Sequence, residues 1–565
     1  MSLWADIGNK LKEVIRKMIG AKTIEQTLHV TPAISSEMEQ AIELWSRMYQ
    51  NKAYWMHEAS ENDPTTVRSL GLPAMIASEK ARMVLIEFQS EITPITEEKE
   101  VENPNYTEPR TDDFGNIIPS AQPPTVMQDF PIGDTTRAEF LNKEYEKLKK
   151  KLRKQLEYGI AKGGLVIKPY VVIDDMDEDE LETGTIPTGH IEFDFIQADS
   201  FYPLSFDASG NITEAAFVQT KVDKDTIYRR LEYHKWERNK VTVINKAYKS
   251  TAGQASGMNG LELGKEIPLS EVPEWADMQE NTTIQNVNQP LFAYFKMPEA
   301  NTIDTSSPLG VSGFDRAKDL IKDADEQYSR LLWEYEGGEL AVDIDRDALR
   351  TEVDSTGRQS TMLPKLQQRL FRNVDLGSSG DTYFPYAPSL RDTSYIQGLN
   401  AILMRIEDVT GLSRGVLSDA TQEARTATEL KILKQRSYQT NLDIQNSLED
   451  TLREVAYIMD VYCTLYNLVG DITISSNGKL DDSNKGQWDI SFEWDDSILT
   501  DVDAELNKRL TLQQNGLASK LEVRMWYFGE TEQQAKEALA RIQDESMESM
   551  ETDLMVQSNL NRGDE

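Results

Sequence analysis

One long helical period constrains this chain more than any other feature of its sequence. Apolar residues recur at helical spacing from Thr426 to about Leu468, and a helix of that length would span roughly 60 Å at 1.5 Å per residue. Helices in compact globular domains are usually much shorter. The segment therefore predicts one extended helix. Its apolar positions are Leu430, Leu433, Ile444, Leu448, Leu452, Val455, Met459 and Tyr462.

Length and composition indicate a folded protein of several parts. The chain has 565 residues, which corresponds to about three or four structural units. Apolar residues make up 39% of it, which is enough for substantial cores. The single cysteine, Cys463, rules out an internal disulfide framework and fits a reducing cytoplasm. No apolar run is long enough for a transmembrane helix, and the first 20 residues do not resemble a secretory signal.

The chain is strongly acidic, with a net charge of −36. Because neutralising phosphates requires Lys and Arg, tight sequence-reading DNA binding by a monomer is excluded. Weak, sliding contact is not excluded, since a like-charged wall suits a duplex that must move. An amphipathic basic helix predicted at residues 3–19 fits either a membrane surface or, as we favour, a terminal arm packed on an acidic neighbour. In a helix predicted at 135–158, Glu144, Glu146 and Glu157 dilute the lysines, which favours a solvated face over a nucleic-acid patch.

The first half of the chain predicts helices and then strands. Helical periods cover about 36–58, 70–92 and 135–158, the last ending at Gly159. Residues 94–133 contain seven prolines and little periodicity, so we predict a long surface loop there. An acidic run at 174–182 lacks the glycine that a calcium loop needs, and 250–289 is predicted as another loop. From 165 onward the period becomes two, which predicts strands at 165–173, 190–197, 213–221, 226–237, 240–248 and 291–296.

The second half is predicted to be mostly helical. A capping box at Ser312 and Asp315 predicts the start of a helix that ends in a left-handed turn at Gly337–Gly338. Short mixed elements are expected at 339–388, a helix at 389–410 and a polar loop at 413–425, before the long helix. Strands at 471–475 and 487–494 predict a hairpin. Three helices follow, with capping boxes at Ser519–Glu522 and Thr531–Gln534, and then an acidic tail. The fold class is α+β, mainly helical.

The sequence lacks the residue patterns of the common catalytic sites. Gly159–Gly164 has no Gly-Lys-Ser/Thr, so no Walker A phosphate loop is present. Cys463 falls in mid-helix with no reason to act as a nucleophile. An alternation of Asp343, Asp345 and Asp347 could attract a cation, but such spacing is common by chance. We predict no catalytic residue, metal site or cofactor. The four histidines, His29, His57, His190 and His234, lack zinc-site spacing.

Four segments together resemble the portal proteins of tailed bacteriophages, especially of long-tailed phages of Gram-positive hosts. The resemblance lies in their order and spacing, which span most of the chain, whereas loops 94–133 and 250–289 match no motif of the family. The segments are Glu43–Trp55; Leu156–Tyr170, a helix that runs through glycines into a strand; Gly310–Ala317 with Asp323, Asp325, Tyr328 and Ser329; and Asp496–Asp501 with Asn515–Lys520 and Phe528–Ala535.

The resemblance implies a ring of twelve subunits with a portal fold: an α/β wing, a helical stem, a small mixed clip and a helical crown. A 60 Å helix with polar faces is natural in such a ring, because neighbouring copies pack around it. Carried onto this chain, the regions are 1–309 for the N-terminal arm and wing, 310–338 for the first stem helix, 339–388 for the clip, 389–412 for the second stem helix, 413–425 for the tunnel loop, 426–495 for the long helix and a wing/crown hairpin, and 496–565 for the crown and acidic tail.

The resemblance also places candidate DNA-contacting residues in the tunnel loop and on the polar face of the stem. A small polar loop of mixed charge can touch phosphates without holding them, whereas sequence readout would need Arg or Asn aimed at base edges. Either some of the stem cations face the DNA, or all of them pair with adjacent subunits. The loop candidates are Ser413, Arg414, Ser418, Asp419, Thr421, Gln422, Glu423 and Arg425, and the stem candidates are Arg316, Lys318, Lys322 and Arg330.

The function implied is that of a portal vertex subunit, a passive channel for DNA packaging and ejection. Expected partners are further copies of the chain, double-stranded DNA passing without sequence specificity, terminase, a head-completion or tail connector protein, and scaffolding and major capsid proteins, with no membrane. The expected location is the virion, after assembly in the host cytoplasm. The alternatives are another minor structural head protein, against which the order of helices and loops argues, and a metal-dependent nucleic-acid enzyme.

Overall fold

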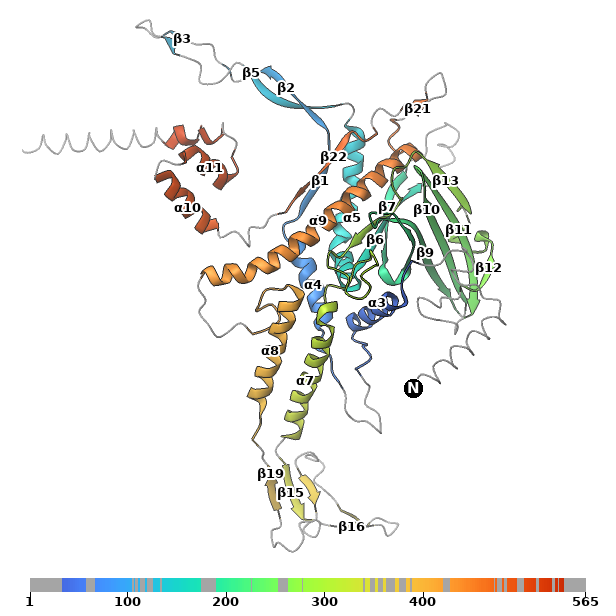
Figure 1. Cartoon of the computed structure of the whole chain (residues 1–565), viewed down its shortest axis with the longest axis vertical. Coiled ribbons are helices and arrows are strands. Elements are labelled where there is room, and N and C mark those ends of the chain that lie inside the picture. The colour runs from blue at the N-terminus through green and yellow to red at the C-terminus, as the bar shows by residue number, and fades with distance from the viewer. Residues whose placement is uncertain are drawn as a thin grey trace, which may run out of the picture. The chain divides into compact units, whose positions relative to one another are not determined.

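The structure is a computed structural model in which helices and sheets are mixed, as expected for an α+β chain (Figure 1). The chain divides into two compact units, Met1–Trp494 and Asp495–Glu565. The predicted helix at 3–19 and the acidic run at 174–182 lie outside the described residues. The described residues are 33–56, 67–103, 106, 110–111, 117–118, 125–132, 135–173, 189–224, 226–251, 263–276, 278–338, 341–345, 351–353, 359–361, 371–374, 383–386, 389–419, 427–471, 473–474, 480–481, 485–494, 502–514, 518–530, 534–536 and 538–542.

Three helices lie in the described N-terminal residues of the first unit. They are α3 (Ser36–Tyr49), α4 (Leu72–Val84) and α5 (Thr136–Lys162). The predicted apolar face of α5 is confirmed, since Leu141, Tyr145, Leu148, Leu152 and Leu156 are buried. Some lysines of α5 pair with carboxylates of the same chain, such as Lys147 with Glu144 and Lys151 with Glu192. The predicted end at Gly159 is wrong, because α5 continues to Gly163, whose positive φ of 86° ends it.

Two antiparallel sheets follow α5. The first has the order β14 (Ala293–Lys296), β6 (Gly164–Ile173), β7 (Gly189–Gln197), and the second β12 (Lys265–Ile267), β11 (Lys240–Thr251), β10 (Thr226–Trp236), β9 (Ile212–Asp223), β8 (Phe201–Phe206), with β13 (Asn281–Gln285) also on β11. The six predicted strands are confirmed. Strand β8 was missed, and β12 and β13 correct the loop predicted at 250–289. A 3₁₀ turn at Ala198–Ser200 leads from β7 into β8 and so joins the two sheets.

Residues 94–133, predicted as a loop, contain paired strands. β1 (Gln89–Pro94) pairs with β22 (Trp488–Glu493), and β2 (Thr96–Glu102) pairs with β5 (Thr125–Pro131). The short β3 (Arg110–Thr111) and β4 (Ile117–Ile118) also pair. The helix predicted at 70–92 therefore ends early, at Val84. The hairpin predicted at 471–475 and 487–494 is wrong, because β20 (Thr473–Ile474) pairs with β21 (Leu480–Asp481).

Two helices, α7 (Lys318–Gly337) and α8 (Asp392–Thr410), lie side by side and antiparallel (Figure 1). The chain between them forms a sheet of β18 (Phe371–Val374), β15 (Ala341–Asp345) and β19 (Tyr383–Tyr386), and a pair of β16 (Thr351–Val353) and β17 (Gln359–Thr361). The predicted capping box at Ser312 is wrong, because a 3₁₀ turn at Asp315–Ala317 precedes α7. The predicted left-handed turn is also wrong: Gly338 has a φ of −89°, and its N–H donates to Glu334 O.

The predicted long helix is confirmed as α9 (Ala427–Tyr466), which has 40 residues and a length of about 60 Å. Its apolar residues Ile444, Leu448, Leu452, Val455 and Met459 are buried. They pack against α4, α5 and the sheet that contains β6 and β14. This part of α9 is therefore covered within its own subunit.

The second unit contains α10 (Val502–Gln514) and α11 (Lys520–Phe528), with further helical residues at 534–536 and 538–542. The capping box at Ser519 is confirmed: Ser519 Oγ accepts from the Glu522 N–H, and Glu522 Oε2 accepts from the Ser519 N–H. Thr531, of the other predicted box, lies outside the described residues. No helix in the described part of the chain is long and apolar enough to cross a membrane.

Candidate functional site

The described part of the predicted tunnel loop is held by one buried carboxylate, Glu407 in the last turn of α8. Glu407 Oε1 accepts hydrogen bonds from the backbone N–H groups of Gly415 (3.1 Å), Leu417 (2.6 Å) and Ser418 (2.9 Å). Its Oε2 accepts a fourth from the Ser418 hydroxyl at 2.7 Å. Ser418 is buried, and both its backbone N–H and its hydroxyl donate to Glu407 within the subunit. We call residues 413–419 the loop base.

The next acidic residue, Asp408, holds the arginine of the loop base. The Arg414 guanidinium donates from Nε to Asp408 Oδ1 (3.2 Å) and from Nη2 to Oδ2 (2.9 Å). The hydrogen bonds and charge of Asp408 raise the pKa of Arg414. A bidentate pair of this kind fixes the plane of the guanidinium. The predicted DNA contact Arg414 thus has a carboxylate partner within its own chain.

The other predicted loop residues are less constrained. The Asp419 N–H donates to the side-chain oxygen of Asn400 at 2.7 Å, while Asp419 itself is exposed. Ser413 is half-buried. The remaining four, Thr421, Gln422, Glu423 and Arg425, lie outside the described residues.

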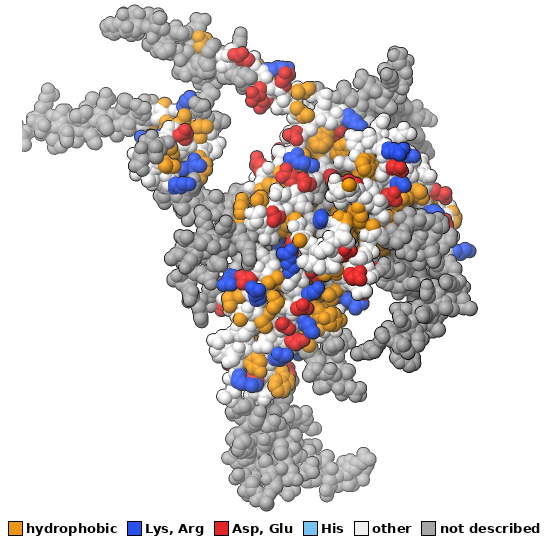
Figure 2. All heavy atoms as spheres, in the orientation of Figure 1, with side chains coloured by type: hydrophobic (Ala, Val, Ile, Leu, Met, Phe, Trp, Pro, Cys, Tyr) orange, Lys and Arg blue, Asp and Glu red, His pale blue; other side chains and the backbone are white. Residues whose placement is uncertain are grey.

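Each of the four predicted stem cations forms an ion pair with a carboxylate of its own subunit. The sequence predicted only contact with DNA or pairing with adjacent subunits, and not these pairs. The distances are 3.6 Å for Arg316–Glu299, 3.7 Å for Lys318–Asp315, 4.0 Å for Lys322–Glu326 and 3.4 Å for Arg330–Glu326. All four cations are partly exposed, so these ion pairs are weak individually. On the face drawn in Figure 2, cationic and acidic side chains of the described residues are interleaved.

Sequence reasoning missed a cation on α8. Arg405 is exposed, and no ion-pair partner for it is found among the described residues. It occupies the helix one turn before Asp408. Periodicity alone could not single it out, because exposed charges are common on the described helices and only the structure shows which of them are paired.

The start of α7 is anchored by two tryptophans of the N-terminal region. Trp45 Nε1 donates to Asp315 Oδ1 at 2.9 Å, and Trp55 Nε1 donates to Asp325 Oδ2 at 3.1 Å. Leu70 N–H also donates to Asp325, at 2.8 Å. Burial raises the pKa of Asp325 even though these donors oppose the shift. The first and third of the resembling segments therefore meet in the fold.

The second resembling segment, Leu156–Tyr170, contacts the third one, which begins at Gly310, through glycines. The Gly313 N–H donates to Ile160 O at 2.9 Å, and the Met297 N–H donates to Gly163 O at 3.2 Å. A Cβ on Gly310 would lie 2.1 Å from Gly163 O, and one on Gly163 would lie 2.7 Å from Gly310 O. Glycine is thus required where the end of α5 crosses the segment that enters α7.

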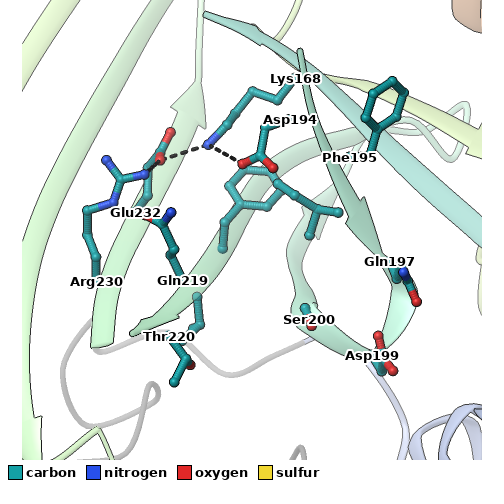
Figure 3. A pocket seen from close by; sticks show the side chains of 13 residues that line it. Lys168, Asp194, Phe195, Gln197, Asp199, Ser200, Gln219, Thr220, Arg230 and Glu232 are labelled. Carbon is teal, nitrogen blue, oxygen red and sulfur yellow. Dashed lines mark hydrogen bonds and ion pairs between the residues drawn. The ribbon is translucent and has the colours of Figure 1, made fainter. Parts of the chain in front are cut away.

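A polar hollow of about 400 Å³ lies among β6, β7, β9 and β10 (Figure 3). Glu232, one of its lining residues, is 2.7 Å from Lys168 Nζ, 3.0 Å from Arg230 Nη2 and 2.7 Å from His234 Nε2. Burial alone would raise the pKa of Glu232, but Lys168, His234 and Arg230 outweigh it and hold the pKa well below its usual range. Burial lowers the pKa of His234. An ionised Glu232 and a neutral His234 make this a structural network that joins the two sheets.

The described residues include no cluster of three His, Cys, Asp or Glu side chains that could hold a metal. Asp343 and Asp345 lie on β15, and Asp347 lies outside the described residues. Burial raises the pKa of the Cys463 thiol to about 12. A thiol that is protonated at neutral pH is a poor nucleophile.

These features define a protein of mixed α/β fold that is built around long helices. Residues 29–552 match the family described as "Phage portal protein, SPP1 Gp6-like". The match covers most of the chain, and the chain belongs to this family of tailed-phage portal proteins. It is therefore a portal vertex subunit of the virion, which serves DNA packaging and the head–tail connection. The family implies a ring oligomer that interacts with capsid, terminase and DNA. The alternative functions are not favoured, and no curated protein matches the chain.

Proposed function

We propose that twelve copies of this chain form a ring whose channel passively conducts double-stranded DNA, while a separate motor hydrolyses ATP. The observation that carries this proposal is the family match over 29–552, combined with the order of α7, a strand region, α8, a polar loop and the 40-residue α9. We propose the regional boundaries predicted above for wing, stem, clip, tunnel loop and crown. The division of the chain after Trp494 lies one residue from the proposed start of the crown and supports it.

Within the channel, we propose that the tunnel loop 413–425 and the polar face of the stem pass along the DNA backbone. Support comes from the weak pairing of Arg316, Lys318, Lys322 and Arg330 on and before α7 and from the exposed Arg405 on the neighbouring helix α8. The net charge of −36 keeps attraction to phosphate low, which suits a duplex that has to slide. The clip would meet the head-completion adaptor and terminase, and the ring would assemble with scaffolding and major capsid proteins in the host cytoplasm.

Electron microscopy of the purified full chain tests the ring. We expect closed rings with twelvefold symmetry in end views. A monomer or a compact dimer under all conditions would contradict the proposal. The same preparation should release no phosphate from ATP, with or without DNA, because the channel and the motor are separate proteins. ATP hydrolysis that purifies with the ring would contradict that part.

The tunnel loop is tested by replacing residues 420–425 with a shorter Gly-Ser linker. This replacement leaves the contacts between Glu407 and the loop base in place, so ring assembly should be unchanged. We expect less nuclease-protected DNA in phage particles, or DNA that leaks after packaging. Normal packaging and infectivity from this variant would count against the assignment of the loop.

A further inference from the structure

Glu407 occupies a position that helix electrostatics alone disfavours. It lies in the last turn of α8, where the unpaired carbonyl groups give the helix end a partial negative charge. It is also fully buried, and burial of a carboxylate is costly unless hydrogen bonds compensate. The chain supplies that compensation from one place only among the described residues, the loop base. The hydrogen bonds from the loop base, and not the helix, therefore stabilise the Glu407 carboxylate at this position.

The loop base is shaped to meet this carboxylate. Gly415 has a φ of 95°, a left-handed conformation that favours glycine. The N–H groups of Gly415, Leu417 and Ser418 then converge on one oxygen, in the manner of a backbone nest that binds an anion. The Ser418 hydroxyl takes the second oxygen. Four donors from three residues thus bind one side chain.

The main chain of Glu407 strengthens the same connection. Its carbonyl oxygen accepts from the N–H of Gly411, the left-handed residue that ends α8, and from the N–H of Leu412 at 3.1 Å. A Cβ on Gly411 would lie 2.5 Å from Thr440 Oγ1 of α9, so the helix end also packs closely against α9. Glu407 therefore binds the chain at two places: its carbonyl group binds the residues that follow α8, and its carboxylate binds the loop base.

We propose that Glu407 is the positioning residue of the tunnel loop, and that it makes the loop base and the last turn of α8 move as one body. This inference rests on the proposed function for the assignment of the loop to the channel. Glu407 does not touch DNA. It sets where the following residues of the loop begin, while Asp408 beside it holds Arg414 in a fixed direction.

Two variants and a matched control test the proposal in full-length rings. Glu407→Ala removes the acceptor, and Glu407→Gln keeps one oxygen for the backbone donors. The control is Glu334→Gln on α7. Glu334 is also a buried carboxylate, and it accepts from the Arg391 N–H (3.1 Å) and guanidinium (2.7 Å) at the other end of α8. Both sites should affect thermal stability, so stability alone does not distinguish positioning from general structure.

The distinguishing readout is amide hydrogen exchange of peptides that cover 413–419. We expect exchange there to rise at least about tenfold in Glu407→Ala and less in Glu407→Gln, with no change in Glu334→Gln. Rings should still form, and packaged DNA should fall in Glu407→Ala beyond any fall in the control. Unchanged exchange in Glu407→Ala, or an equal packaging defect in Glu334→Gln, would overturn the inference. A wild-type chain that forms no ring would instead contradict the proposed function, and the exchange result would remain interpretable.

Discussion

The indole of Trp45 donates a hydrogen bond to the carboxylate of Asp315 at 2.9 Å, across 270 positions of sequence. Both residues are buried. Asp315 also accepts from the Thr302 hydroxyl and lies near Lys318. The contact joins α3 to the turn that begins α7. It thereby attaches the N-terminal region to the helix pair proposed as the stem.

Trp45→Phe should destabilise the chain. The change removes a hydrogen bond to a buried carboxylate, which contributes on the order of 1.5–3 kcal/mol, and it leaves part of the indole volume empty. Circular dichroism at increasing denaturant would show a lower unfolding midpoint. Trp333→Phe is the control, because Trp333 on α7 is 65% exposed and should leave the midpoint unchanged. Equal midpoints for Trp45→Phe and the wild type would show that the contact contributes nothing.

Gly310→Ala should be far more damaging than its size suggests. The new Cβ would lie 2.1 Å from Gly163 O and 2.9 Å from Met297 N. Both are backbone atoms that cannot move independently, so we expect a cost of about 3 kcal/mol or more. Gly337→Ala is the matched control, since nothing lies within 4 Å of its Cβ position and alanine favours the helix. Soluble yield and melting temperature would separate the two. A Gly310→Ala protein as stable as the control would mean that the crossing relaxes easily.

These two sites show what the sequence could and could not predict. Strands such as β6 and β10 were predictable because alternation is a local pattern. The pairing of β1 with β22 was not, since its residues are about 400 positions apart: Ile92 lies opposite Ile490. Likewise, the glycines at 163 and 310 were visible as motif residues, but their mutual contact was not.

The candidate site also has features that the sequence could predict and features that it could not. The polarity and position of the loop 413–425 could be predicted from composition and resemblance. The pairing of Arg414 with Asp408 could not, because a charge run gives no indication of which partners meet. Glu407 was missed because a single glutamate near the end of a helix is ordinary in an acidic chain. Only its burial and its four donors distinguish it.

The buried His234 predicts a specific pH dependence of stability. Burial lowers its pKa, so the unfolded chain binds more protons than the folded chain below the ordinary histidine value of about 6.5. The stabilisation is therefore complete above pH 6.5 and is lost as the pH falls below it, by up to about 1.4 kcal/mol per pH unit. His234→Gln can still donate to Glu232 but does not titrate, so unfolding curves between pH 7.5 and 5.5 should show a smaller pH dependence than for the wild type. His190→Gln is the control, because His190 is half-buried. An unchanged slope in His234→Gln would contradict the prediction.

Asp408→Asn should make the ring hold DNA more tightly. The change removes the negative charge and one of the two acceptor oxygens that bind the Arg414 guanidinium through Nε and Nη2, so the guanidinium is held less firmly and can turn toward phosphate. Each added phosphate contact makes the dependence of log K on log salt steeper by about 0.9. Binding of purified rings to short duplex DNA, measured from low to high salt, would detect this change, and packaging should slow. Glu449→Gln is the matched control, since it removes the charge of a carboxylate that pairs with Arg453 on α9, outside the loop. A salt slope in Asp408→Asn equal to that of the control would show that Arg414 does not reach the DNA.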